Sequence, residues 1–288
     1  MISIILRAKN EMPWVRSTLE MLRKQDRQDF ELLCVDSGST DGTWQFLQNQ
    51  KPDIIYQIKP EEYIPGKVLN DAIARTKGDI IVFNNADCIP LNDNWLSNLV
   101  RPLENNPDLI AVFANQFARP DAISLVKKDY ERAFGDGCIH SSWRHFFSLA
   151  SSAVRRDIIT KYPFNPEIQY SEDIEWSWRM KKLGYKIAYV PDAKVEHSHN
   201  YNLRQVIKRY TGEGKAERVI YEEEYAAEAA RGSVKDFNFL RSVVIASGME
   251  TLRDWLWLIG KGEWLWLLKA PLYRFLQRYS AWKGRTGK

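Results

Sequence analysis

The sequence predicts an α/β protein with a doubly wound, mostly parallel sheet and a helical C-terminal appendage. Short apolar runs, suited to strands buried on both faces, alternate with helical stretches over the first hundred residues. Alternation of strand and helix at this spacing is typical of parallel sheets. The composition changes from about residue 237, because five of the eleven tryptophans lie beyond that point. We therefore expect a main domain over 1–236 and a separate tail over 237–288.

The first part of the main domain, residues 1–108, supplies four strands and the helices between them. Residues 3–6 form the first expected strand, and Leu19 and Leu22 mark an apolar helical stripe after it. The next expected elements are strand 30–35, helix 43–50, strand 54–58, helix 67–76 and strand 79–83. Each strand leads into a polar loop, where ligands of open parallel sheets bind.

The second part, residues 109–236, continues the sheet with expected strands at 109–113 and 146–154. Between them, residues 119–145 form a long excursion that we interpret as a functional loop or a helical insert. Its aromatic and imidazole side chains include Tyr130, Phe134, Trp143 and His145. Further helices are expected to open at 155–157 and 171–173.

Composition narrows the class of protein. The 288 residues are 44% hydrophobic, enough for a core without disulfides. Cys34, Cys88 and Cys138 show neither zinc spacing nor a Cys-x-x-Cys pair, so we expect a reducing, cytoplasmic compartment. The chain enters a strand at once, and we expect no signal peptide. A net charge of +4 is too small to indicate nucleic acid as a partner.

The strand at 79–83 ends in the polar sequence Asn84-Asn85-Ala86-Asp87. A carboxylate at a strand exit is well placed to hold a hard divalent cation, and such a cation can carry the phosphates of a nucleotide. A simple turn is the alternative interpretation. The two commonest phosphate-binding loops are absent: no G-x-G-x-x-G follows the first expected strand, and G-x-x-x-x-G-K-[ST] does not occur in the sequence.

Other polar residues stand at strand exits and helix starts. Asp36 can accept hydrogen bonds from a base or a ribose, or can serve the turn that follows, and Arg7 can reach a base or phosphates or lie on the surface. Lys67 opens a helix, where it can meet a diphosphate as a point charge or remain solvated, and Asn70 lies one turn later on the same face. Asp41 is interpreted as a structural residue that caps the following helix.

Five ordered blocks of the sequence resemble the inverting glycosyltransferases of family 2. They cover Val35-Asp36-Ser37-Gly38-Ser39-Thr40-Asp41-Gly42-Thr43, Gly66 to Ala72 with Thr76 to Asp79, Asn85-Ala86-Asp87, Ser171 to Trp176, and Val195 to Tyr201. The last block is similar to the bacterial rhamnosyltransferase branch. The resemblance extends over residues 1–215 and implies a GT-A fold, a nucleoside-diphosphate sugar donor and a glycan or lipid-linked acceptor.

The resemblance also implies roles for individual residues. It places Asn85-Ala86-Asp87 where the family has its metal-binding D-x-D, with Mn²⁺ or Mg²⁺ as the cofactor. Because Asn85 carries no charge, the metal is expected to be held mainly by Asp87, or to bind more weakly; a protein that is metal-independent or inactive is the alternative. The implied nucleotide contacts are Arg7, Asp36, Lys67, Asn70, Asn85 and Ala86.

On the acceptor side, an attacking hydroxyl requires one base beside the anomeric carbon. Asp173 is our candidate and Glu172 the second choice, although acidic residues in a first helical turn also serve as caps. Trp176 is a candidate sugar platform or a core residue. His197 and His199 share a face if their segment is extended, and imidazole suits Mn²⁺. The resemblance places one histidine near the metal and the diphosphate, and His197 fits its pattern better, so we expect His197 to bind the metal. His199 and the helical Arg209 are expected to contact the diphosphate or the acceptor; a pair of histidines in a surface loop is the alternative.

The tail combines tryptophans with basic residues. After Glu263 there is no acidic residue, so we expect the charged residues that follow to face no local acid. All six of them are basic: Lys269, Arg274, Arg278, Lys283, Arg285 and Lys288. No segment reaches the ~20 consecutive apolar residues of a membrane span. Tryptophan with Lys and Arg is typical of the bilayer interface. We expect a tail that docks on the cytosolic face of the plasma membrane, or a hairpin that packs on the domain or forms a homodimer.

The sequence thus predicts a glycosyltransferase that builds a cell-surface polysaccharide, with rhamnose as the expected sugar on the resemblance alone. A non-catalytic nucleotide- or sugar-binding module is the alternative that Asn85 suggests. A sugar-phosphate nucleotidyltransferase would need a glycine-rich loop after the first strand, and residues 7–11 contain no glycine.

Overall fold

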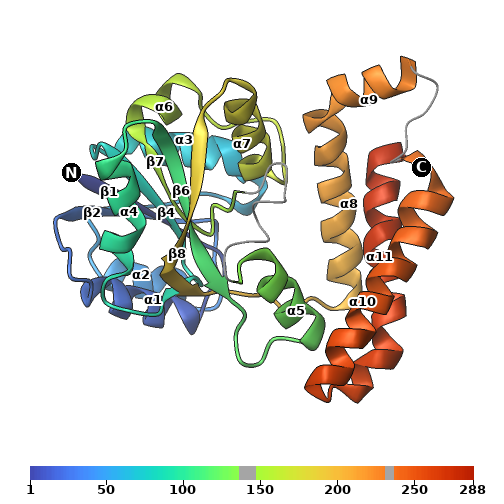
Figure 1. The fold of residues 1–288 in the computed structure, drawn as a ribbon. Helices are drawn as coiled ribbons and strands as arrows, with labels where there is room; N and C mark the ends of the chain where they lie inside the picture. Colours follow the sequence, from blue (N-terminus) through green and yellow to red (C-terminus); the bar gives the residue numbers. More distant parts are fainter. Residues whose placement is uncertain (136–146, 231–236) are drawn as a thin grey trace. The chain divides into compact units, whose positions relative to one another are not determined.

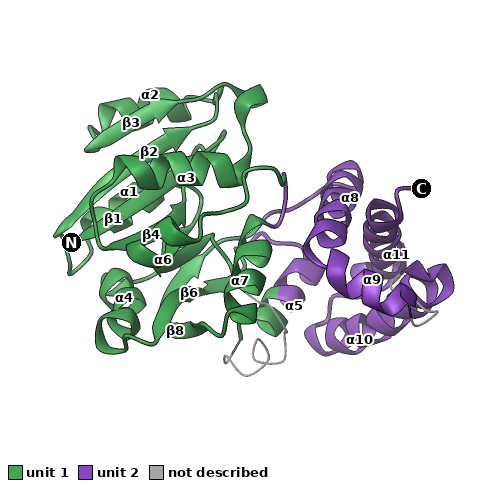
Figure 2. Cartoon of the chain, turned by 90° about the horizontal axis from the view of Figure 1, so that it is seen from above, with its two compact units in different colours: residues 1–119, 130–168, 172–198 green, residues 120–129, 169–171, 199–288 purple. Residues whose placement is uncertain are grey.

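The computed structural model describes residues 1–135, 147–230 and 237–288. These residues divide into two compact units (Figure 2). Unit 1 comprises residues 1–119, 130–168 and 172–198, and unit 2 comprises residues 120–129, 169–171 and 199–288. Cys138, Trp143 and His145, which the sequence analysis singled out, lie outside the described residues.

Unit 1 is built on an eight-stranded sheet with the order β3-β2-β1-β4-β7-β6-β8-β5 (Figure 1). The strands are β1 (Ile2–Ala8), β2 (Phe30–Asp36), β3 (Ile54–Gln57), β4 (Ile80–Asn85), β5 (Ile89–Pro90), β6 (Leu109–Phe117), β7 (Ser151–Arg155) and β8 (Lys186–Glu196). The pairs β1–β2, β1–β4, β2–β3 and β6–β8 are parallel. Only β7, between β4 and β6, and the short β5 pair antiparallel in this part of the chain. The mostly parallel sheet that the sequence predicts is confirmed.

Helices cover both faces of this sheet. They are α1 (Trp14–Arg23), α2 (Thr43–Asn49), the 3₁₀ turn η1 (Pro60–Glu62), α3 (Pro65–Arg75), α4 (Trp95–Asn105), α6 (Arg156–Lys161) and α7 (Glu172–Lys182). Val15, Leu19 and Leu22 recur at helical spacing and bury one face of α1 in a core shared with α4. A second core contains Leu69 of α3 and Met180 of α7. The sheet thus has one core on each face, as expected for a doubly wound fold, in which helices cover both faces of one sheet.

Strand register brings the polar loops of unit 1 to one edge. Ala8 of β1 lies opposite Asp36 of β2, and Arg7 of β1 lies opposite Asn85 of β4. Because these strands are parallel, their carboxyl ends meet at the same edge, where ligands of such sheets bind. The loops after β1, β2 and β4 therefore form the framework of a site.

Two strands differ from their expected bounds. The apolar stretch at 146–154 was expected to be one strand, but β7 begins at Ser151 and residues 149–150 form a turn. Phe147 and Leu149 are apolar because they fill the core, at 1% and 2% exposure, without joining the ladder. In contrast, β6 extends four residues beyond the expected end at Phe113, to Phe117.

Unit 2 is helical. Its elements are α8 (Leu203–Ile220), α9 (Glu222–Ala230), the π-helical segment η4 (Leu240–Ile245), α10 (Ala246–Lys261) and α11 (Trp264–Thr286), and it includes the first part of α5 (Ser124–Ala133). Its core joins α5, α8, α10 and α11 through Leu125, Val206, Leu258, Ala270 and Tyr273. The tail expected at 237–288 thus shares one compact unit with α8 and α9.

Glycines allow α8 and α11 to approach closely. A Cβ added to Gly214 of α8 would lie 2.1 Å from the carbonyl oxygen of Ala281, and one added to Gly284 of α11 would lie 2.2 Å from that of Thr211. No side chain fits at such distances, so the backbones of the two helices pack directly against each other at this crossing.

Buried charges also tie α11 into unit 2. The guanidinium of Arg274, 5% exposed, donates to Asp254 at 2.7 Å and to Asp129 at 2.8 Å. Lys128 makes a further ion pair with Asp254, which is fully buried. Each buried charge has a partner of opposite sign, as burial in a low-dielectric interior requires.

Candidate active site

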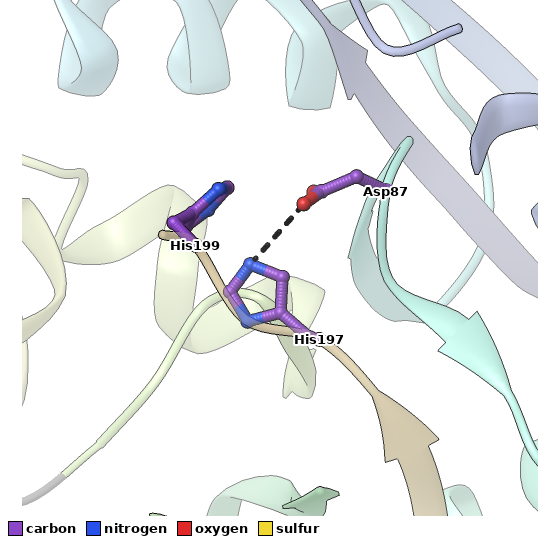
Figure 3. Close-up of side chains that lie close together, drawn as sticks. All are labelled: Asp87, His197 and His199. Carbon is purple, nitrogen blue, oxygen red and sulfur yellow. Dashed lines mark ion pairs between the residues drawn. The ribbon is translucent and has the colours of Figure 1, made fainter. Parts of the chain in front are cut away.

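Asp87 and His197 face each other at the carboxyl edge of the sheet (Figure 3). Asp87 follows β4 and His197 follows β8, and their side chains are nearly buried, with 2% and 8% exposure. The Nε2 atom of His197 lies 3.7 Å from Oδ2 of Asp87. The pair that the sequence analysis assigned to a metal is therefore brought together by the fold.

The surroundings of His197 fix which of its ring nitrogens faces Asp87. Nδ1 lies 2.9 Å from Oε1 of Gln116, while Nε2 of Gln116 donates to Ser148 at 2.8 Å and thereby orients the amide. Because an amide oxygen can only accept, Nδ1 of His197 carries the proton. In the neutral ring, the lone pair of Nε2 then points toward the Asp87 carboxylate. Two acceptors that face each other suit a cation between them, and an N–H donated to an oxygen is the usual support of a metal-binding histidine.

His199 follows two residues after His197. One candidate ligand atom from each of Asp87, His197 and His199 lies within 4.8 Å of the others (Figure 3). One carboxylate and two imidazoles form a mixed oxygen and nitrogen donor set, which suits Mn²⁺ better than Mg²⁺. These residues therefore fit the divalent metal that the sequence predicts.

Arg119 is a site residue that the sequence analysis did not identify. Its guanidinium donates to Oδ2 of Asp87 at 3.3 Å, and its backbone N–H donates to Ser198 at 3.0 Å. The guanidinium also lies over the ring of Trp14, 4.1 Å from the centroid. The signal was the length of β6: once the strand extends to Phe117, Arg119 falls just beyond its carboxyl end.

Carboxyl groups gather around this cluster. Burial, followed by the charges of Asp87 and Asp41, raises the pKa of Glu11 to about 8, while Arg119 opposes the shift. A positive charge placed here would favour the ionised form of Glu11, so the cluster suits a cation. Arg119 supplies one positive charge here, and a metal at Asp87 would share that carboxylate with it.

Arg7 links the two sides of the site. It lies near the end of β1, and its guanidinium donates to Oε1 of Glu172 at 3.0 Å and to Oδ1 of Asn85 at 3.3 Å. Asn85 ends β4, two residues before Asp87, whereas Glu172 begins α7. One side chain thus connects the loop of the candidate metal residues with the helix of the candidate base.

Asp173, the neighbour of Glu172, is held differently. Its carboxylate accepts from the backbone N–H groups of Ile174 at 2.9 Å and Leu149 at 3.4 Å. Removal from water, followed by the negative charge of Glu172, raises the pKa of Asp173 to about 7. A carboxyl group with this pKa can gain and lose a proton near neutral pH, whereas Glu172 is engaged by Arg7.

Asp36 is fully buried and organises the loop after β2. Its Oδ1 atom accepts from the backbone N–H groups of Gly38 at 3.0 Å and Ser39 at 2.9 Å, and from the side chain of Gln57 at 2.7 Å. Its predicted contact with the nucleotide stays a prediction. Asp41 accepts from the N–H of Thr43 at 3.0 Å and of Met12 at 2.9 Å. Asp41 therefore has a structural role and joins the loops after β1 and β2, although the N-cap position of α2 belongs to Gly42 rather than to Asp41.

Three further residues were expected to bind the nucleotide: Asn70, Lys67 and Ala86. Asn70 uses its amide to donate to and accept from the backbone of Phe164, at 2.8 and 3.0 Å, and so fastens α3. Lys67 is exposed on the same helix, and Ala86 is buried with its N–H donating to the Arg7 carbonyl. The assignments of these three residues to nucleotide binding stay predictions.

Of the two interpretations of Trp176, a sugar platform or a core residue, the structure favours the core residue. Its side chain is fully buried, packs against Phe147 and Phe164 at ring distances of 5.6 and 5.8 Å, and donates from Nε1 to the Tyr162 carbonyl at 2.7 Å. A ring enclosed in the core presents no face to a ligand. Arg209 lies on α8 in unit 2, where it pairs with Glu213 at 2.7 Å, and its assignment to the diphosphate stays a prediction.

Comparison with known proteins adds a family. The sequence pattern of the family described as "Glycosyl transferase family 2" matches residues 3–160. The O-antigen chain rhamnosyltransferase WbaN of Salmonella anatum is 32% identical over 203 residues, which cover 67% of this chain and 64% of WbaN. The O-antigen chain rhamnosyltransferase RfbN of Salmonella typhimurium is 28% identical over 224 residues, 74% of this chain and 71% of RfbN. The chain thus spans slightly less than two thirds of the length of WbaN.

Solved structures share the fold. A mannosyltransferase from Pyrobaculum calidifontis, in complex with GDP-Man and Mn²⁺, superposes with a TM-score of 0.64 at 20% identity, covering 100% of this chain and 87% of the other. Glucosyl-3-phosphoglycerate synthase from Mycobacterium tuberculosis, with Mn²⁺, UDP-glucose and phosphoglyceric acid, gives a TM-score of 0.53 at 26% identity, covering 72% and 74%. The expected GT-A fold is confirmed.

Proposed function

Because this chain belongs to glycosyl transferase family 2, we propose that it transfers a sugar, with inversion at the anomeric carbon, from a nucleoside-diphosphate donor to a hydroxyl of a glycan or lipid-linked acceptor. The observation that carries the proposal is the position of Arg7, which contacts both Asn85 beside the metal cluster and Glu172 beside the candidate base. A displacement reaction needs both a group that stabilises the leaving diphosphate and a base for the attacking hydroxyl, and it needs them at one place. Rhamnose is the proposed sugar, supported by the O-antigen rhamnosyltransferases among the relatives.

Asp87 and His197 are the proposed ligands of Mn²⁺ or Mg²⁺, with His199 as a third. When bound, the metal would neutralise negative charge on the departing nucleoside diphosphate. The chain prepares the site: Gln116 sets the ring of His197 so that Nε2 faces the Asp87 carboxylate. Arg119 offers a fixed positive charge on the same carboxylate.

Asp173 is the proposed general base. Its carboxylate takes the proton of the acceptor hydroxyl while the hydroxyl oxygen forms a bond to the anomeric carbon. The bond between that carbon and the diphosphate oxygen breaks, and its electron pair leaves with the nucleoside diphosphate. A pKa of about 7 makes Asp173 a stronger base than an ordinary carboxylate, yet leaves much of it ionised near neutral pH.

Arg7 is the proposed positioning residue. By pairing with Glu172, it neutralises the neighbour of Asp173 and holds the start of α7 against the ends of β1 and β4. We place the reaction in the cytoplasm, at the inner face of the membrane where a lipid-linked acceptor would be presented. The buried thiols of Cys34 and Cys88, neither of which forms a disulfide, accord with a reducing compartment.

The test is a panel of UDP-, dTDP- and GDP-linked sugars with Mn²⁺ and without acceptor, read as the released nucleoside diphosphate. We expect slow hydrolysis of one donor, with dTDP-rhamnose first, and loss of that hydrolysis in Asp87→Ala. A donor that binds in calorimetry but releases no diphosphate, even with membrane extracts as acceptor, would show a non-catalytic binding module instead. Release of nucleoside diphosphate from a donor with a different sugar would support a transferase, but with that sugar in place of rhamnose.

A further inference from the structure

Helix α10 carries an exposed apolar stripe on the side opposite its buried face. The stripe recurs every three or four residues, as one helical face requires. It begins at Ile245, the last residue of η4, and continues in α10 with Met249, Leu252, Leu256 and Ile259. Leu256 is 76% exposed, whereas Asp254 and Leu258, on the opposite side, are fully buried. The helix is therefore apolar on a face that the rest of unit 2 does not cover.

Helix α11 repeats this arrangement. Its exposed apolar residues are Trp264, Leu265, Leu268, Leu272 and Phe275, again at helical spacing. Leu268 is 84% exposed, while Ala270 and Tyr273 face the core of unit 2. Single exposed leucines are ordinary, but two stripes of this length on consecutive helices indicate an interaction surface.

The two helices form one hairpin. They are joined at Gly262, whose φ of 73° gives the left-handed turn between them, and Nε1 of Trp255 donates to the carbonyl of Leu267 at 2.8 Å. Figures 1 and 2 show α10 and α11 side by side. We call the surface formed by their two stripes the hairpin surface.

The chain segment that carries the hairpin surface exposes only basic charged side chains. Within residues 237–288, the exposed charged side chains are Arg241, Arg253, Lys261, Lys269, Lys283 and Lys288. The acidic residues of this segment are less accessible: Glu250 pairs with Arg278, Asp254 pairs with Arg274, and Glu263 is half-buried. The outward charge of the tail thus has one sign.

This corrects one expectation from the sequence. The six basic residues after Glu263 were expected to face no acid, but three of them are paired within unit 2. Arg274 contacts Asp129 and Asp254, Arg278 contacts Glu250, and Arg285 contacts Glu217 at 2.6 Å. The outward charge comes instead from lysines and from the earlier Arg241 and Arg253.

We propose that the hairpin surface docks on an anionic lipid bilayer. The exposed leucines and Trp264 would enter the boundary between headgroups and acyl chains, and the exposed Lys and Arg side chains would lie near lipid phosphates. A second copy of the chain fits less well, since two surfaces of the same charge repel each other. Among the described residues, no helix is long and apolar enough to cross a membrane, so the contact is peripheral.

The test is sedimentation of the full chain with vesicles of phosphatidylcholine, alone or mixed with phosphatidylglycerol. Wild type should bind the mixed vesicles, and binding should weaken with salt. The double variant Leu256→Glu/Leu268→Glu should bind at least ~10-fold more weakly, because it removes two apolar insertions. Both residues are highly exposed, so the fold, monitored by circular dichroism, should be unchanged.

Matched controls locate the effect. Leu183→Glu changes an apolar residue of unit 1, directly after α7, with 53% exposure and should leave vesicle binding unchanged. Lys261→Glu/Lys269→Glu should weaken binding to the mixed vesicles, whereas Lys51→Glu, on the surface of unit 1, should not. Equal binding by wild type and Leu256→Glu/Leu268→Glu would overturn the proposal. A second outcome would also overturn it: wild type forms a dimer in light scattering that does not bind vesicles, and Leu256→Glu/Leu268→Glu is a monomer. The experiment needs no donor, so its result is separate from that of the proposed function.

Discussion

The guanidinium of Arg7 lies 3.0 Å from the carboxylate of Glu172, although 165 positions separate the two residues in the chain. This ion pair distinguishes two adjacent carboxylates that the sequence alone leaves nearly equivalent. Glu172 is paired with a guanidinium that cannot lose its proton at ordinary pH. Asp173 remains the group of the pair that can accept a proton.

Replacement of Asp173 by asparagine tests the base. The substitution keeps the shape but removes proton affinity, so kcat should fall by ~100-fold or more while the affinity for nucleoside diphosphate changes little. Transfer rates and calorimetry would measure the two effects. Glu175→Gln is the control, since Glu175 pairs with Arg179 on the same helix. A severe defect in Glu172→Gln with a mild one in Asp173→Asn would assign the base to Glu172.

The pH dependence follows from the same residue. The pKa of Asp173 is raised to about 7, so the active carboxylate is present above that pH, and kcat/KM should fall as the pH drops through about 7. The charge of Glu172 is one cause of the shift. Glu172→Gln should therefore move the acidic limb to lower pH, and Glu175→Gln should not. An unmoved limb in Glu172→Gln would show that another group controls it.

The raised pKa also affects stability. A folded-state pKa above the ordinary 3.8 means that the native protein binds the Asp173 proton more tightly than the unfolded chain does. This residue therefore lowers the free energy of unfolding as the pH rises from about 4 to about 7. Asp173→Asn should be more stable than wild type at pH 7, with a smaller difference at pH 4, in denaturant titrations. An equal difference at both pH values would exclude the linkage.

Metal binding should depend on Asp87 and His197. Asp87→Asn and His197→Ala should each weaken Mn²⁺ binding by ~10-fold or more, because each removes a ligand from a small donor set. Calorimetry with MnCl₂ and nucleoside diphosphate measures this, and Asp108→Asn, an exposed substitution in unit 1, is the control. Full transferase activity in excess EDTA would contradict the prediction. Arg119 and its neighbours would then be the groups that neutralise the charge of the leaving nucleoside diphosphate.

Arg119 should oppose the metal while supporting the fold. Arg119→Met leaves the buried Asp87 without its guanidinium and should lower the free energy of unfolding by about 3 kcal/mol. The freed carboxylate should then bind Mn²⁺ more tightly, so MnCl₂ should raise the melting temperature of the variant more than that of wild type. Arg27→Met, which removes a surface ion pair, should cost less than about 1 kcal/mol and show the wild-type response to Mn²⁺.

The close crossing of α8 and α11 gives a stability prediction in unit 2. Gly214→Ala would place a methyl group 2.1 Å from the Ala281 carbonyl oxygen, so the helices must separate, at a cost of about 1–3 kcal/mol. Gly248→Ala in α10 meets nothing within 4 Å and should be neutral or stabilising by up to about 1 kcal/mol. Chemical denaturation of both variants measures the difference. Equal effects would mean that the crossing opens without cost.

Local sequence determines the parts of this fold that could be predicted. Buried parallel strands are continuous apolar runs, so the strands around Ile4, Leu33 and Val82 were identifiable, and the polar residues that follow them were identifiable as an edge. Asp87 was recognised because it ends such a run. His197 was recognised from its block of the sequence, and the fold then placed it against Asp87.

Contacts between distant segments could not be predicted in the same way. Gln116 and Arg119 reach the site because β6 pairs with β8, and this pairing depends on the whole sheet. Trp176 stayed ambiguous between a sugar platform and a core residue, because helical spacing shows that α7 has an apolar face but not what covers that face. The Arg7–Glu172 ion pair likewise joins the first strand to a helix far along the chain.

The interleaving of unit 2 with unit 1 along the sequence affects how this protein can be shortened. A stop codon near residue 236 would appear to remove only the tail, yet it would expose Leu125 and Val206, which share the core of Leu258 and Tyr273. It would also remove Arg274, the partner of Asp129 in unit 2. Truncated enzyme would therefore be a poor reagent for assays or crystallisation, and surface substitutions on the intact chain are the sounder route to a more tractable protein.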